Sequence, residues 1–125
     1  MKIEMIVEKT RTGYSAYAVK YAVFTTGKTL DQLKGNILEA VNLYMVEVGK
    51  PEISIDQLKI TLDLPQFFSF YKVINAKALS ERIGMNQSLL AQYIKGIKAP
   101  SQQQTQRILK GVREVGRELA EINFS

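Results

Sequence analysis

The chain has 125 residues, a formal net charge of +5 and a pI of about 9.5. This length allows one domain or two small ones, and the ordinary share of apolar residues argues against a wholly disordered chain. Cysteine and histidine are both absent, which excludes disulfides, a typical zinc site, a Ser-His-Asp triad and a histidine general base. We therefore expect no enzyme activity, no catalytic residue, no metal and no cofactor.

No apolar run approaches the ~20 residues that a membrane span requires, and the first ten residues have no signal-peptide apolar region. We expect a cytoplasmic protein without a membrane contact. The basic excess is uneven, because residues 1–72 carry a net charge of +1 and residues 73–125 carry +4. A cationic C-terminal half is the charge distribution expected for contact with nucleic acid.

The N-terminal half predicts a small sheet covered by one helix. Apolar and polar residues alternate over residues 2–8, and residues 14–19 and 22–25 read as two further strands. Thr29 and Gln32 have capping-box spacing and mark the start of a helix. Gly49 and Pro51 mark the end of this helix. Its expected apolar stripe is Leu30, Leu33, Ile37, Val41, Tyr44 and Val48.

Residues 58–64 alternate strictly and predict a fourth strand, which gives an α+β fold class with the order strand, strand, strand, helix, strand. A segment rich in phenylalanine follows, and Pro65 suits the first turn of a helix. We interpret Phe67, Phe68 and Tyr71 as packing residues for the C-terminal half, since no basic residue is interleaved with them before Lys72; stacking on bases is the alternative. The predicted domains are therefore 1–64 and 65–125.

Residues 75–101 predict two short helices joined by a tight turn. Gly84 stands where the first helix must stop, and Asn86 is a suitable N-cap for the second helix. No acidic residue occurs between Arg82 and Glu114. Amides and hydroxyls at a helix N-terminus, with lysines nearby, suit base edges and phosphates in a DNA groove. An ordinary two-helix packing unit is the alternative interpretation.

We predict two classes of contact with double-stranded DNA from this segment. Base edges would be contacted by Gln87, Ser88 and Gln92. Phosphates would be contacted by Asn75, Lys77, Asn86, Lys95 and Lys98.

Residues 102–124 read as a helix in which Gly111 and Gly116 permit a bend or a break. Its apolar stripe begins at Ile108, and part of the stripe must close the C-terminal core. The part from Val115 onward would either contact a second copy or fold back onto its own domain. We expect a homodimer or a higher homo-oligomer, because proteins that bind DNA through such a pair of short helices commonly contact two half-sites about one DNA turn apart.

Two resemblances give these patterns a family context. The segment GMNQSLLAQYIKGIKAPS resembles the helix-turn-helix of phage-repressor (Xre-type) regulators. The stretch GYSAYAVKYAVFTTGKTLDQLKGNILEAVNLYM is similar to the N-terminal domain of HicB-family antitoxins, through a Gly-Tyr-x-x-Tyr strand, a Gly-x-Thr-Leu turn and a long helix. The matching positions are Gly13, Tyr14, Tyr17, Gly27, Thr29, Leu30 and the helix through Tyr44.

Together the resemblances imply an antitoxin-like transcriptional regulator. Its N-terminal domain would neutralise a HicA-type mRNA-cleaving toxin, and its C-terminal helix-turn-helix would bind double-stranded operator DNA. The alternative is a stand-alone DNA-binding repressor whose N-terminal domain senses a ligand or dimerises, without a toxin partner. An enzyme is disfavoured by the missing histidine and cysteine.

Overall fold

The computed structural model describes residues 2–124, which contain a four-stranded sheet and five α-helices and form a mixed α+β structure. The chain divides after Phe70 into two compact units. Residues 2–70 form the first unit and residues 71–124 form the second unit.

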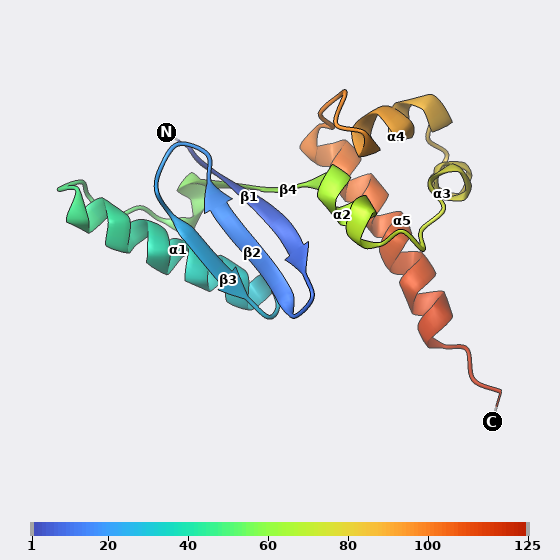
Figure 1. The fold of residues 1–125 in the computed structure, drawn as a ribbon, viewed down its shortest axis with the longest axis horizontal. Coiled ribbons are helices and arrows are strands. Elements are labelled where there is room, and N and C mark those ends of the chain that lie inside the picture. Colours follow the sequence, from blue (N-terminus) through green and yellow to red (C-terminus); the bar gives the residue numbers. More distant parts are fainter. Residues whose placement is uncertain (1, 125) are drawn as a thin grey trace. The chain divides into compact units, whose positions relative to one another are not determined.

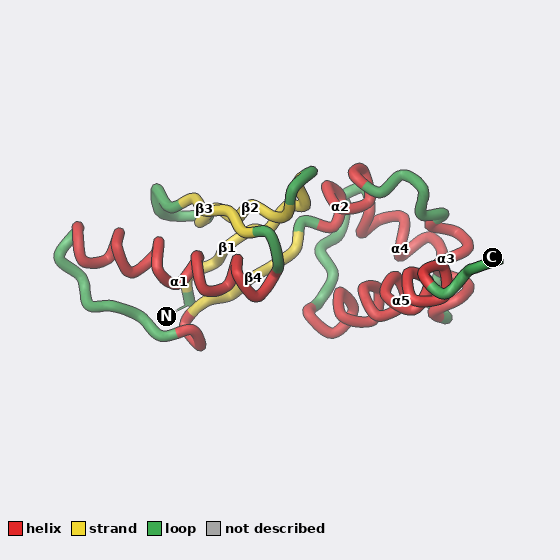
Figure 2. The backbone as a smooth tube through the Cα atoms, turned by 90° about the horizontal axis from the view of Figure 1, so that it is seen from below, coloured by secondary structure: helices red, strands yellow, loops and turns green. Residues whose placement is uncertain are grey.

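The first unit contains one sheet, one long helix and one short helix (Figure 1). Its elements are β1 (Ile3–Thr10), β2 (Gly13–Ala18), β3 (Phe24–Gly27), α1 (Leu30–Glu47), a 3₁₀ turn (Ile55–Gln57), β4 (Leu58–Leu62) and α2 (Leu64–Phe70). The strand order is β3-β2-β1-β4, with β4 parallel to β1 and the other pairs antiparallel. Helix α1 runs along one face of this sheet (Figure 2).

Alternation along β1 buries Ile3, Met5 and Val7 as predicted, and the register places Met5 opposite Ala18 and Val7 opposite Ala16. The third strand was predicted two residues too early. Residues 19–23 form a turn instead, closed by the Ala18 N–H, which donates to the Val23 carbonyl at 3.0 Å.

The helix α1 begins at the predicted cap, since the Thr29 hydroxyl oxygen accepts from the Gln32 N–H at 3.1 Å. The buried stripe of this helix is Leu33, Ile37, Val41 and Met45. The prediction was wrong for Leu30 and Val48, which are about half exposed. They stand at the first helical residue and at the C-cap, so neither belongs to the row of residues, spaced by four, that covers the sheet.

Two glycines explain how closely the layers of the first unit approach. A Cβ placed on Gly13 would lie 2.3 Å from the Gly27 carbonyl oxygen, and one on Gly27 would lie 2.7 Å from the Leu33 Cα. Real Cβ atoms are not found so close to backbone atoms. The two glycines of the HicB-like motif are thus the positions where strand meets strand and strand meets helix.

Helix α2 groups with the first unit, whereas the sequence-based boundary after Leu64 assigned it to the C-terminal domain. The reason lies in Gln66, whose side chain pairs with the main chain of Lys9 at the end of β1. The Lys9 N–H donates to Oε1, and Nε2 donates to the Lys9 carbonyl, both at 2.8 Å. Phe68 is buried and Phe67 packs edge-on against it.

The second unit is all-helical and contains α3 (Ala76–Ile83), α4 (Gln87–Ile94) and α5 (Gln102–Ala120). Helix α3 packs against both α4 and α5. Helix α5 continues through both glycines without a break. The buried apolar side chains of this unit are Leu79, Met85, Leu90, Tyr93 and Ile108.

Candidate nucleic-acid interface

The segment from α3 to α4 is fixed by side-chain caps at both helix starts. The Asn75 Oδ1 accepts from the Ala78 N–H at 3.0 Å, and the Asn86 Oδ1 accepts from the Leu89 N–H at 3.1 Å. Gly84 ends α3 in the left-handed region, with a φ of 68°. The helix, turn and helix predicted from residues 75–94 are therefore present with their expected start and stop residues.

A longer-range contact then holds this turn against α5. The Arg107 Nη2 donates to the Ile83 carbonyl at 2.9 Å and to the Gly84 carbonyl at 2.7 Å. These are carbonyls at the end of α3, where no intrahelical N–H remains to bond them. Gly111 lets the helices approach, since a Cβ there would lie 2.3 Å from the Ile83 Cγ2. The turn is thus braced by one arginine and one glycine from α5.

The three predicted base-contact residues do not share one environment. Gln87 and Ser88 are the first two residues of α4 and are exposed. Gln92 lies in the last turn and is half-buried, while its carbonyl accepts from the Ile97 N–H at 3.0 Å. Gln87 and Ser88 are therefore the more accessible amide and hydroxyl groups.

All five predicted phosphate-contact residues are exposed, and they lie near the ends of the two short helices. Asn75 and Asn86 already use their side-chain oxygens as caps, so a phosphate contact would use their amide N–H groups. Lys95 is the C-cap of α4, and Lys98 follows in the loop after Gly96, whose φ is 76°. Since α4 has eight residues, its two ends, which carry Asn86 and Lys95, lie only about 12 Å apart. Lys77 lies in the first turn of the other helix, α3.

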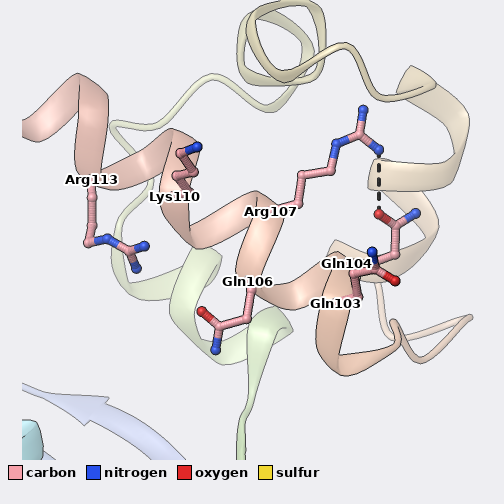
Figure 3. A pocket seen from close by; sticks show the side chains of 6 residues that line it. All are labelled: Gln103, Gln104, Gln106, Arg107, Lys110 and Arg113. Carbon is pink, nitrogen blue, oxygen red and sulfur yellow. Dashed lines mark hydrogen bonds between the residues drawn. The ribbon is translucent and has the colours of Figure 1, made fainter.

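Helix α5 was not among the predicted DNA contacts, but this helix presents a cationic surface. An open depression of about 800 Å³ lies along it (Figure 3) and is lined by Gln103, Gln104, Gln106, Arg107, Lys110 and Arg113. Arg107, Lys110 and Arg113 recur every three residues, which places them on one side of a helix. That spacing in an acid-free segment was the signal that could have identified this surface.

The charge balance separates the two units. The first unit carries eight Lys or Arg and eight Asp or Glu, whereas the second carries nine and four, a net of +5. No carboxylate occurs in residues 83–113, which include the turn, α4 and most of the cationic surface of α5. A cationic surface rich in amide groups can contact phosphates and hydrogen-bond base edges.

Across residues 2–124 the structure contains no group of three or more carboxylates placed to hold a metal ion. Within the same residues, no helix combines the length and the apolar character needed to cross a membrane. The pKa of the Asp56 carboxyl is held below its usual value, chiefly by the hydrogen bond from the Ser54 hydroxyl. This shift belongs to a residue of the first unit and not to the candidate interface.

The fold and the charge distribution define a mixed α+β protein with a neutral sheet-containing unit and a cationic helical unit. The chain is 35% identical over 49 residues to a UPF0150 protein of Archaeoglobus fulgidus, and the match covers 39% of this chain and 74% of the archaeal protein. The chain therefore belongs to the UPF0150 family. No family model and no solved structure matches it.

Proposed function

We propose that this protein is an antitoxin-like transcriptional regulator. Its second unit binds operator DNA through α4, and its first unit binds and neutralises a HicA-type mRNA-cleaving toxin. The observation that carries the DNA half is the exposed start of α4, where Gln87 and Ser88 stand in an acid-free surface with Lys95 and Lys98 at its other end.

The geometry supports a division of labour among these residues. Gln87 and Ser88 reach base edges from the N-terminal end of α4, as in recognition helices that enter the major groove with that end first. Lys77, Lys95 and Lys98, with the capping Asn75 and Asn86, contact phosphates and fix the register. Gln92 contributes through the part of its side chain that remains accessible.

The DNA half is tested with a labelled duplex covering the region upstream of the protein's own reading frame. We expect Gln87→Ala to weaken binding by about 1–3 kcal/mol and to relax sequence preference, since one bidentate contact is lost. Lys98→Ala should weaken binding to all sequences alike and reduce the salt slope by about one unit. Fluorescence anisotropy over a salt series measures both quantities. Equal affinity of the wild type for this duplex and for an unrelated one would refute operator binding.

The toxin half rests on the family and on the shape of the first unit. The UPF0150 family is related to HicB-like antitoxins. The close approach of β2, β3 and α1 also explains why the HicB-like motif has glycines at its two positions, Gly13 and Gly27. The discriminating experiment is co-expression with the product of the neighbouring reading frame, followed by purification and mass measurement. A stable complex in which mRNA cleavage is suppressed is the expected result.

We further propose that the regulator acts as a homodimer or a higher homo-oligomer. Leu119 and Ile122 are each 62% exposed at the end of α5 and just beyond it. Exposed apolar side chains in such a row suit a contact with a second copy. Light scattering on the purified full chain measures the stoichiometry, and a monomer at operator-binding concentrations would contradict this part of the proposal.

A stand-alone repressor without a toxin partner is the second candidate, and one feature favours it. The sheet face opposite α1 carries a row of side chains across three strands, Ile6, Tyr17 and Phe24, and Phe24 is 66% exposed. Such a row suits dimerisation of the first unit. Failure to recover any complex with the neighbouring gene product, together with intact operator binding, would favour this candidate.

A further inference from the structure

The outer side of α1 carries a groove that the fold of the first unit does not use. Helix α1 buries one side against the sheet, and the groove lies on the other side, with a volume of about 390 Å³. It is lined mainly by Gly35, Leu38, Leu43 and Val46, with Glu39 and Glu52 among the lining residues.

The walls of this groove are held by specific contacts. Asn42 bonds the main chain of Ile53 twice, because its Oδ1 accepts from the Ile53 N–H at 2.7 Å and its Nδ2 donates to the Ile53 carbonyl at 3.1 Å. These bonds tie the segment that carries Glu52 to the side of α1. Gly35 leaves the opposite end open, since a Cβ there would meet no atom within 4 Å.

Leu38 also packs against the core of the first unit, but the other two large apolar side chains in the groove are not explained by the core. Leu43 is 66% exposed and Val46 is 61% exposed, although both lie on the solvent side of an amphipathic helix. That side is normally polar. Two large aliphatic side chains beside an open glycine form a surface of the kind that marks a protein contact.

The charge of the groove indicates the occupant. Glu39 and Glu52 supply two carboxylates, and no lysine or arginine is among the lining residues. An arginine or lysine can lay its aliphatic stem on Leu38 and Val46 while its head group pairs with one of these carboxylates. A neutral or acidic partner would leave both carboxylates without this pairing.

We infer that this groove holds the protein partner of the first unit through a cationic amphipathic segment, in which aliphatic side chains alternate with arginine or lysine. The inference rests on the proposed function, and its chemistry agrees with it: a protein that cleaves mRNA needs cationic side chains to hold phosphates. Occupation of an acidic groove by such a segment takes those side chains away from RNA.

The test uses the full chain and, as the partner, the product of the neighbouring reading frame, with affinity measured by isothermal titration calorimetry. Gly35→Leu fills the groove from a position with open space, and Glu39→Arg reverses the charge at its rim. We expect each variant to weaken the complex by about tenfold or more. Two matched controls should stay within about threefold of the wild type: Gly35→Ala, which leaves most of the space, and Glu8→Arg, which reverses a charge on β1.

Folding and oligomeric state are checked for every variant by circular dichroism, thermal melting and light scattering, and operator binding should not change. Wild-type affinity for the partner in both groove variants would overturn the inference and leave the proposed function standing. A loss caused by Glu8→Arg alone would place the partner on the sheet instead. A change of oligomeric state in Gly35→Leu without the partner would assign the groove to a second copy. No complex with the wild-type chain would overturn both the inference and the toxin half of the proposed function.

Discussion

The two units reach a fixed geometry by different means. In the first unit, strands and helix approach until backbone atoms are in contact. This close approach is possible only because the residues at these contacts, Gly13 and Gly27, are glycines without a Cβ. In the second unit, three helices with few buried side chains are positioned by bonds to their ends, from Asn75, Asn86 and Arg107. The first depends on close backbone packing, and the second on satisfied helix termini.

This difference has a functional side. The first unit has no net charge and presents a sheet face and an acidic groove. The second unit has a net charge of +5 and presents amide and cationic side chains. Helices held by their ends keep side chains such as Gln87 exposed, because little of α4 has to be buried. A mutation should therefore disturb the first unit mainly through backbone clashes, and the second through the loss of a cap or a brace or through a clash at Gly111.

The largest expected effect tests the backbone packing of the first unit. Gly27→Ala would place a Cβ 2.7 Å from the backbone of Leu33, and neither the strand nor α1 can move away without losing core contacts. We expect a loss of about 3 kcal/mol in the free energy of unfolding. Gly35→Ala is the matched control, because the added Cβ meets open space and should stabilise α1 by about 1 kcal/mol.

Hydrogen exchange measures these changes separately in each unit, which a single thermal transition cannot do. Amides of β2 and α1 should lose protection in Gly27→Ala, and those of α3 and α4 should not. If protection fell equally in both units, the two units would unfold together as one cooperative structure. A stable Gly27→Ala protein would contradict the importance of the close approach.

The second prediction applies the same comparison within α5. Gly111→Ala would bring a Cβ to 2.3 Å from the Ile83 Cγ2, whereas Gly116→Ala meets nothing within 4 Å. Both gain about 1 kcal/mol of helix propensity, but only the first incurs an overpacking cost of about 1–3 kcal/mol. We expect Gly111→Ala to lower the stability of the second unit and Gly116→Ala to raise it.

Exchange protection of α3 and α4 amides measures the sign of each change. Two stabilising substitutions would show that Ile83 can shift at little cost. Two destabilising substitutions would show that α5 requires flexibility at both positions rather than a close contact at one.

Local patterns in the sequence predicted much of this structure. Alternation identified the buried side chains of β1, and cap residues identified the starts of α1 and α4, because these signals depend on residues a few positions apart. The position of β4 beside β1 and the parallel pairing of these two strands could not be read in the same way. They depend on contacts between residues about 55 positions apart, such as Ile3 and Leu58.

The same limit applies to the candidate sites. The acid-free segment around α4 was visible in the sequence, and its contacts with DNA stay a prediction. The brace from Arg107 to Gly84 joins residues 23 positions apart, and no local pattern indicates it. Leu43 and Val46 lay off the predicted stripe of α1, yet the groove between them and Glu52 depends on the Asn42 contact with Ile53.

The smallest expected effect distinguishes a brace from a charge. Arg107→Met removes the donor to two carbonyls at the end of α3, and Arg113→Met removes an equal charge from the same helix. Because those carbonyls are exposed and can bond water, we expect Arg107→Met to cost about 1 kcal/mol of stability, while Arg113→Met costs less than half of that.

Each variant loses one positive charge, so a similar reduction in the salt slope of DNA binding is expected if both arginines lie near phosphates. Only Arg107→Met should also reduce exchange protection at the start of α4, because the turn before it is no longer held. Equal loss of protection in both variants would mean that the charge of α5, rather than the bonds from Arg107, stabilises the turn.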